Sequence, residues 1–158
     1  MLLLIALLLG VAAGLRSMTP LAVVAWAAHA WPSVAASPLS FMAARPVAYV
    51  FTIFAVGELI ADKLPFIPSR LKPGPLIARL GSGALCAAVA AIGATASSAD
   101  ASLLLPSLVG AIGGVAGAFA GYHTRRSVTV SQGLPDLAVA LVEDVIAIGL
   151  AIFAVSRI

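Results

Sequence analysis

The sequence predicts an all-α membrane protein, a polytopic bundle of transmembrane helices. Of its 158 residues, 62% are hydrophobic and only 9% are charged, whereas soluble globular domains carry about 25% charged residues. The mean hydropathy is +1.14, and the hydrophobic residues form long runs separated by short segments rich in proline, serine and charge. Too few charged side chains remain to keep such a chain in water. We therefore expect residues 1–158 to form a single transmembrane domain.

Five hydrophobic runs are long enough, or nearly so, to cross a membrane. A helix needs about 20 mostly apolar residues to span a hydrocarbon layer of about 30 Å. Prolines in the connecting segments end the helices on either side. The five predicted spans are residues 2–31, 41–61, 76–96, 103–121 and 134–156.

The first run is interrupted at residues 14–20. Pro20 lacks a backbone N–H and disfavours helical geometry at Thr19. An interrupted helix exposes backbone groups that in lipid must be satisfied by protein, water or a solute, and transporters use broken helices to aim half-helix ends at a substrate. We expect one broken span. The alternative is a re-entrant hairpin, which would move the N-terminus to the other side of the membrane.

Basic residues in the connections predict the orientation. Residues 62–79 contain Lys63, Arg70 and two further basic residues, and residues 122–133 contain two arginines, whereas residues 97–102 contain only the acidic Asp100. Because basic residues concentrate in cytoplasmic loops, the two basic connections are predicted to be cytoplasmic, with the N-terminus inside and the C-terminus outside. The net charge of +3 is thus a topology signal, and we expect the lipid bilayer, not nucleic acid, as a partner.

Charged residues inside the predicted spans indicate a functional site. A charge at the bilayer centre costs about 2.5–3.5 kcal/mol on insertion scales, so such a residue must face a partner, water or the bundle interior. Glu143 and Asp144 are adjacent and point about 100° apart on a helix, so they cannot both face one partner. The residues predicted to line a solute or ion pathway are Arg16, Thr19, Pro20, Glu58, Asp62, Arg79, Glu143 and Asp144.

These charges admit several interpretations. In the first, they line a path for a small polar or ionic solute; Arg16 binds an anionic group or neutralises an acid, and Glu143 or Glu58 is the protonatable coupling residue. In the second, they form internal ion pairs in a non-transporting scaffold or accessory subunit. In the third, Arg79 lies at the cytoplasmic interface and forms, with Glu58 and Asp62, the face of a membrane-embedded enzyme that modifies lipids. We expect a transporter or channel-like protein and no catalytic residues.

Glycines predict close contacts between helices. Small residues let helix backbones approach each other in lipid, where no hydrophobic force drives association. We favour packing inside the chain, and contact with a second copy in a homodimer remains open. The predicted packing residues are Gly10, Gly14, Gly113, Gly117 and Gly121.

A weak internal repeat suggests inverted symmetry. Residues 10–17 resemble residues 117–125, and residues 55–61 resemble residues 140–146. The offset is three spans, an odd number, so the two copies would lie upside down relative to each other, as in many secondary transporters.

No residue pattern predicts a metal site or a cofactor. His29 and His123 are far apart, and no carboxylate stands near either at the spacing of metal ligands. The chain also lacks the glycine-rich motifs that bind phosphates or dinucleotides. His29, beside Trp26 and Trp31, fits an aromatic belt at the membrane interface.

Four stretches together resemble a known family. They are residues 14–21 (GLRSMTPL), 57–65 (GELIADKLP), 78–84 (ARLGSGA) and the segment from residue 133 to residue 144 that begins GLPD and ends in Glu143 and Asp144. In these features the chain is similar to the domain of unknown function 4126 family of small bacterial integral membrane proteins. The resemblance covers nearly the whole chain and implies a compact, multi-pass bundle in the inner membrane. The resemblance implies no particular activity.

Overall fold

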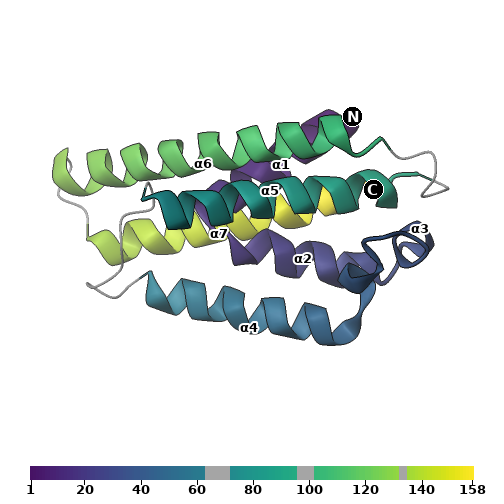
Figure 1. Ribbon diagram of the computed structural model, residues 1–158. Coiled ribbons are helices and arrows are strands. Elements are labelled where there is room, and N and C mark those ends of the chain that lie inside the picture. Colours follow the sequence, from purple (N-terminus) through teal and green to yellow (C-terminus); the bar gives the residue numbers. More distant parts are fainter. Residues whose placement is uncertain (63–71, 96–101, 132–134) are drawn as a thin grey trace.

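The computed structural model describes residues 1–62, 72–95, 102–131 and 135–158, and this part of the chain is helical without strands (Figure 1). The predicted helical bundle is confirmed. The elements in chain order are α1 (Leu2–Leu15), α2 (Met18–Ala28), α3 (Pro32–Ala35), the 3-10 helix η1 (Ser40–Ala43), α4 (Arg45–Ala61), α5 (Pro73–Gly93), α6 (Leu104–Ser131) and α7 (Asp136–Val155).

The last four predicted spans correspond to α4, α5, α6 and α7. Their predicted ends agree with the helices to within a few residues except in α6, which continues to Ser131 instead of ending at residue 121. The helix continues because no proline or glycine follows Gly121 before Gly133. Lys63, Arg70 and Asp100, which entered the prediction of orientation, lie outside the described residues.

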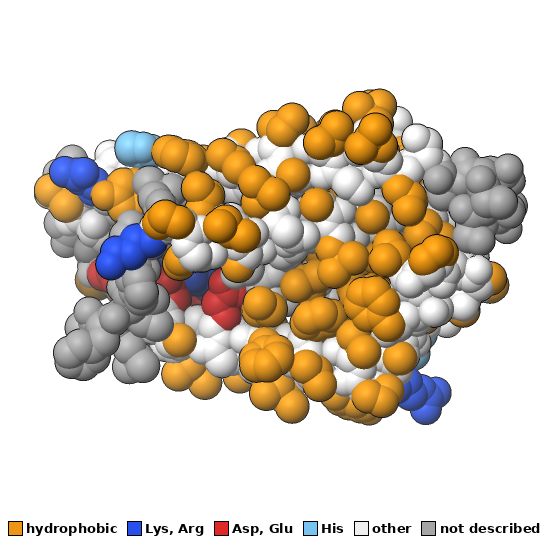
Figure 2. Space-filling model, viewed as in Figure 1, with side chains coloured by type: hydrophobic (Ala, Val, Ile, Leu, Met, Phe, Trp, Pro, Cys, Tyr) orange, Lys and Arg blue, Asp and Glu red, His pale blue; other side chains and the backbone are white. Residues whose placement is uncertain are grey.

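The exterior of the bundle is apolar. Among the described helices, α5, α7 and the Leu104–Val130 stretch of α6 are long and apolar enough to cross a membrane. Ile53 in α4, Ile112 in α6 and Val145 in α7 are each at least 64% exposed. Figure 2 shows apolar side chains over much of the visible face, whereas the acidic side chains gather in its left-hand part, where they reach inward from the end. Such a surface suits contact with lipid acyl chains.

α1 packs between α5 and α6 through glycines. A Cβ built on Gly10 would lie 2.9 Å from Gly113 Cα, and one built on Gly14 would lie 2.6 Å from Gly117 Cα, so neither position has room for a side chain. Residue numbers rise together along this contact, so α1 and α6 run in the same direction. An inverted repeat would require these two glycine-rich helices to run in opposite directions, and they are not related in that way. The remaining predicted packing glycine, Gly121, lines a groove beside this contact.

α2 runs back along the bundle, opposite to α1. The carbonyl oxygen of Ser17, just before α2, accepts a hydrogen bond from Ser82 Oγ near the middle of α5 at 2.5 Å. Trp31, just after α2, covers Gly93 at the end of α5. α2 thus runs parallel to α5, whereas α1 runs antiparallel to it, and Figure 1 shows the N-terminus and the end of α2 at the same end of the bundle.

The first hydrophobic run is therefore interrupted, as predicted, and its two short helices fold back on each other as a hairpin, which is the chain path of the second arrangement considered from the sequence. Arg16 turns the chain with an extended backbone, φ −140° and ψ 111°. The two helices contain 14 and 11 residues, fewer than the roughly 20 that a crossing requires. The tip of the hairpin consequently ends inside the bundle.

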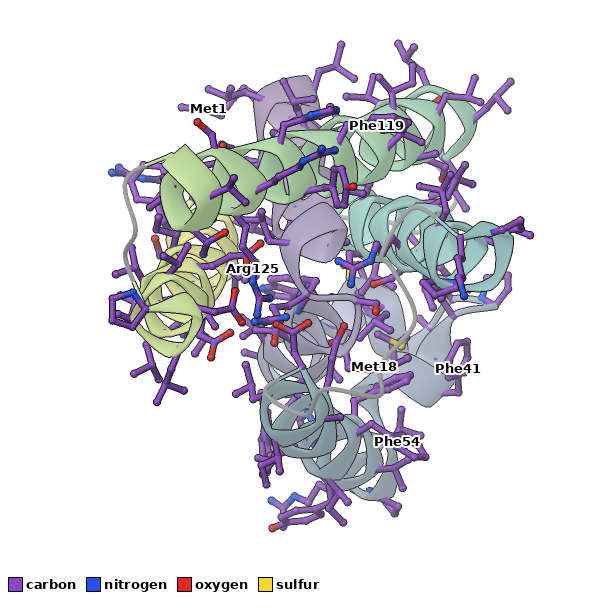
Figure 3. All side chains as sticks on the ribbon, turned by 90° about the vertical axis from the view of Figure 1, so that its left-hand side faces the viewer. Met1, Met18, Phe41, Phe54, Phe119 and Arg125 are labelled. Atoms are coloured by element: carbon purple, nitrogen blue, oxygen red, sulfur yellow. The ribbon has the colours of Figure 1, made fainter. Side chains whose placement is uncertain are left out.

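α4 lies at the periphery, where it packs on α2 and η1. Trp26 Nε1 in α2 donates to Thr52 Oγ1 in α4 at 3.0 Å, and the Trp26 ring meets Tyr49 edge to face. In the end-on view of Figure 3, α4 lies on the far side of α2 from α6, and Phe54 is on its outer side. Charged side chains at the end of α4 reach the rest of the bundle.

Candidate functional site

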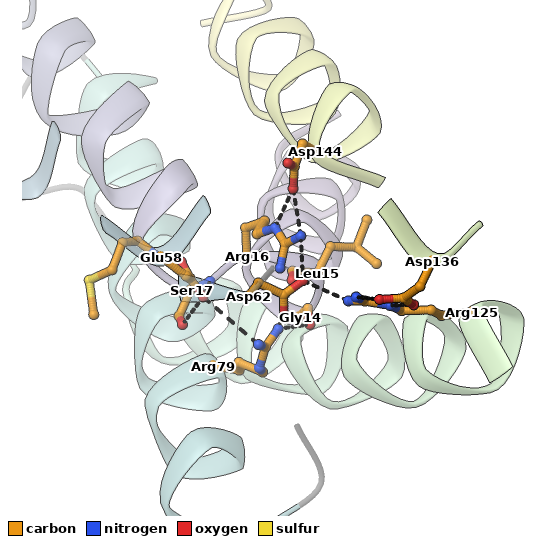
Figure 4. A network of polar contacts seen from close by, with 11 residues as sticks. Gly14, Leu15, Arg16, Ser17, Glu58, Asp62, Arg79, Arg125, Asp136 and Asp144 are labelled. Atoms are coloured by element: carbon orange, nitrogen blue, oxygen red, sulfur yellow. Dashed lines mark hydrogen bonds and ion pairs between the residues drawn. The ribbon is translucent and has the colours of Figure 1, made fainter. Parts of the chain in front are cut away.

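The hairpin tip carries a buried arginine that is held by carboxylates from two other helices. Arg16 is 0% exposed. Its Nε donates to Asp144 Oδ1 of α7 at 2.6 Å, and its Nη2 lies 2.8 Å from Oδ2 of Asp62, which follows α4 (Figure 4). Three segments far apart in the sequence therefore meet at one guanidinium. The two carboxylates offset the free energy that burying its charge costs.

Glu58 of α4 caps the second half of the hairpin. The first N–H groups of a helix lack partners within the helix and carry partial positive charge. Glu58 Oε1 accepts hydrogen bonds from Ser17 N at 2.9 Å and Ser17 Oγ at 2.8 Å, and Glu58 Oε2 accepts one from Met18 N at 2.8 Å. The carboxylate thus accepts hydrogen bonds from the backbone N–H groups at the start of α2.

Arg79 of α5 closes the first half of the hairpin. The last carbonyl groups of a helix need donors and carry partial negative charge. Arg79 Nη1 donates to the carbonyl oxygens of Gly14 and Leu15, the latter at 2.8 Å. Arg79 is only 5% exposed, so it lies in the interior of the chain. Its Nη2 is 3.8 Å from Oε1 of Glu58, one of the two acids with which the sequence analysis grouped it at the cytoplasmic interface. The glycine contacts that draw α1 onto α5 and α6 explain this position.

Arg125 extends the network toward the end of the bundle. Its Nη1 donates to Asp62 Oδ2 at 2.6 Å, and its Nε and Nη2 donate to Asp136 Oδ1 and Oδ2 at 2.7 and 2.6 Å. Figure 3 shows Arg125 pointing inward among the helices. The sequence analysis assigned neither Arg125 nor Asp136 to the predicted site. The four-residue spacing of Gly117, Gly121 and Arg125, which puts them on one helix face, was the available signal.

Thr19 and Pro20 are buried in the first turn of α2, next to the tip. Thr19 is 5% exposed, and its Oγ1 makes no hydrogen bond with a described residue. Arg16 Nη1 is likewise without a hydrogen bond in the described part of the chain. Thr19 and Arg16 thus each have a buried polar atom at the hairpin tip.

Glu143 and Asp144 face different surroundings, as expected from their angular separation. Asp144 binds Arg16, whereas Glu143 lines a groove of about 260 Å³ between α1, α6 and α7. The groove also contacts Leu15 and Arg125, so it borders the charged network. We call it the α6–α7 groove. It is lined by Val11, Leu15, Gly117, Ala120, Gly121, Thr124, Arg125, Val139, Val142, Glu143, Ile146 and Leu150.

The charged side chains associate as arginine–carboxylate pairs. Within the described ranges, no group of three or more His, Cys, Asp and Glu side chains is arranged to hold a metal ion. His29 stacks on Trp26 with the ring centroids 5.6 Å apart, and its Nδ1 lies 2.9 Å from the carbonyl oxygen of Ala25. The contacts that join Arg16, Asp62, Arg125 and Asp144 are ion pairs and hydrogen bonds.

Comparisons with known proteins identify the family. Searches of curated proteins and of solved structures found no match. A family model described as Domain of unknown function (DUF4126) matches residues 3–157. This match spans nearly the whole chain and contains every residue of the charged network. The chain therefore belongs to the DUF4126 family.

Proposed function

We propose that the chain is a small multi-pass transporter or channel-like protein of a bacterial inner membrane, and that it moves a small polar or ionic solute past the hairpin tip. The observation that carries the proposal is the burial of Arg16 between Asp62 and Asp144 at the tip of a re-entrant hairpin. Charges inside a membrane protein are costly and usually belong to a substrate, ion or proton pathway. Half-helices that end at the charges fit the same role.

A solute would act at Asp62 by replacing one member of the ion pairs that Asp62 forms with two arginines. Its Oδ2 lies 2.8 Å from Arg16 Nη2 and 2.6 Å from Arg125 Nη1. A cation or proton at Asp62 would compete with both arginines, whereas an anion would compete with Asp62 for them. Because α4 packs on α2 and η1, loss of the two ion pairs would release its end from α1 and α6. Solute binding would thereby favour a second position of α4.

Glu143 is the better candidate for the protonatable coupling residue. Glu58 accepts three hydrogen bonds that hold the start of α2, so its protonation would uncap that helix. Glu143 lines the α6–α7 groove, and its protonation would change the charge of the groove without uncapping α2. We therefore assign proton coupling to Glu143. The proposed pathway is formed within one chain and does not require a homodimer.

Flux into proteoliposomes tests the proposal. Vesicles that contain the purified chain and a pH-sensitive dye are exposed to gradients of sodium, potassium, ammonium or chloride, with and without a pH gradient. We expect flux above that of empty vesicles for the wild type and its loss in Asp62→Asn and Glu143→Gln. Arg126→Gln is the matched control, since Arg126 is exposed and adjacent to Arg125. Flux of every probe at the level of empty vesicles, or equal flux in all variants, would contradict the proposal.

A non-transporting scaffold is the second candidate, and the capping of both hairpin ends by Glu58 and Arg79 favours it. In a scaffold the charges only hold the fold, so an apolar replacement of an ion pair can preserve it. We therefore combine Arg16→Met and Asp144→Leu in one double variant. Loss of the wild-type flux in a folded double variant supports transport, whereas a folded double variant and a wild type that both show no flux support the scaffold.

A further inference from the structure

The α6–α7 groove combines an apolar wall with a buried carboxylate. It encloses about 260 Å³, and of its lining residues only Thr124, Arg125 and Glu143 are polar. Glu143 is 8% exposed. Val142 and Ile146, which also line the groove from α7, are 59% and 49% exposed. The groove is therefore accessible from the apolar exterior of the bundle, where acyl chains would lie.

The charges around the groove favour a cation. Arg125 uses its Nε, Nη1 and Nη2 in hydrogen bonds to Asp62 and Asp136, so two carboxylates offset its positive charge. The other charged group in the lining of the groove is the carboxylate of Glu143.

The position of Glu143 limits what kind of cation can reach it. Glu143 follows Asp136, the first residue of α7, by seven positions, which corresponds to about 10 Å along the helix axis. A hydrated inorganic ion would have to give up most of its water at this depth, and one carboxylate replaces few ligands. An organic cation surrounded by apolar groups keeps little water and gains contact with the groove wall.

We propose that the α6–α7 groove binds a lipophilic organic cation, which enters from the bilayer and pairs with Glu143. This inference rests on the proposed transport function and names its substrate class. Arg125 from α6 closes one end of the groove, and Leu15 separates it from Arg16 at the hairpin tip. The bound cation therefore lies next to the ion pairs of Asp62, which link α4 to the bundle.

Calorimetric titration of the purified full chain in detergent with tetraphenylphosphonium tests the inference. We expect saturable binding to the wild type, binding about tenfold or more weaker to Glu143→Gln, and retained binding to Glu143→Asp, because the charge pair forms in a medium of low dielectric constant. Ala120→Phe places a ring in the groove and should also abolish binding. Ala116→Phe is the matched control, since Ala116 is exposed one turn earlier in α6 and does not line the groove.

Tetraphenylborate, an anion of similar size and shape, separates charge recognition from partition into detergent. Equal affinities for the anion and the cation overturn the inference, as does equal binding of the cation to the wild type and Glu143→Gln. Absence of saturable cation binding to the wild type overturns it as well, while flux of hydrophilic ions would still support the proposed transport function. Glu143-dependent binding without flux of any probe, tetraphenylphosphonium included, supports the inference and overturns transport.

Discussion

Glu58 and Arg79 meet between the two halves of one helical hairpin, with 3.8 Å between Glu58 Oε1 and Arg79 Nη2. The carboxylate satisfies the N–H groups that begin α2, and the guanidinium satisfies the carbonyl groups that end α1. Helix ends inside an apolar layer have no water to bind them. α4 and α5 therefore supply the hydrogen-bonding groups that allow the chain to turn there.

Removal of the Glu58 carboxylate should destabilise the protein. Glu58→Ala leaves the N–H groups of Ser17 and Met18 without their acceptor, and we expect a loss of about 1–3 kcal/mol. Glu58→Gln retains one acceptor oxygen and should lose less. Thermal unfolding of the purified variants in detergent, followed by intrinsic fluorescence, measures the difference. An unchanged midpoint for Glu58→Ala would show that the cap contributes nothing.

A single methyl group at Gly14 should disrupt the packing of α1. The added Cβ would lie 2.6 Å from Gly117 Cα, in backbone that cannot move aside cheaply. Gly14→Ala should therefore unfold at a lower temperature or fail to elute as a single species in size-exclusion chromatography. Gly81→Ala is the control, because a Cβ there meets nothing within 4 Å and alanine favours the helix by about 0.5–1 kcal/mol. Equal behaviour of the two variants would contradict the packing argument.

Replacement of Arg16 alone should be worse than its replacement together with Asp144. Arg16→Met removes the cation shared by the buried Asp144 and the half-buried Asp62, which still pairs with Arg125, and we expect a loss of about 3–5 kcal/mol. Addition of Asp144→Leu removes one of those carboxylates and should recover part of that loss, which a double-mutant cycle reports as a coupling of about 0.5–3 kcal/mol. Chemical denaturation in detergent provides the four stabilities. Strict additivity would mean that the ion pair at 2.6 Å carries no energetic coupling.

Both chain termini should lie on the same side of the membrane. The hairpin returns the chain to the side of its N-terminus, whereas one broken span would place the termini on opposite sides. With Cys86 replaced by alanine, we expect a membrane-impermeant maleimide to label Ala36→Cys and Ser156→Cys from one side and Ser127→Cys from the other; all three positions are exposed. An epitope tag fused before Met1 should be accessible from the same side of the membrane as Ala36→Cys. Opposite accessibility of the tag and Ala36 would exclude the hairpin.

Much of the bundle was predictable because it depends on local composition. The long apolar runs that became α5 and α7 carry proline and charge at their ends, and these determine where each helix begins. The angular separation of Glu143 and Asp144 also followed from helix geometry alone. The glycines that bring α1 and α6 together were recognisable from their four-residue spacing.

The remaining features depend on contacts between distant segments. The sequence shows that residues 14–20 interrupt a helix, but the direction of the chain after Arg16 depends on Glu58 and Arg79, which bind the two exposed helix ends. Likewise, the polar residues after Gly121 resemble a loop, and Arg125 becomes part of the interior only because Asp62 and Asp136 receive it. Local hydropathy predicts neither the contacts of Glu58 and Arg79 with the hairpin nor those of Arg125.

The pairing of Arg16 with Asp144 joins the first hairpin to the last helix that is synthesised. The two residues are 128 positions apart, and at translation rates of about 5–20 residues per second the later one follows after roughly 6 to 26 seconds. Throughout that interval Arg16 has been made and Asp144 has not. This contact between the first hairpin and the last helix can therefore form only late in synthesis, once residue 144 has been made.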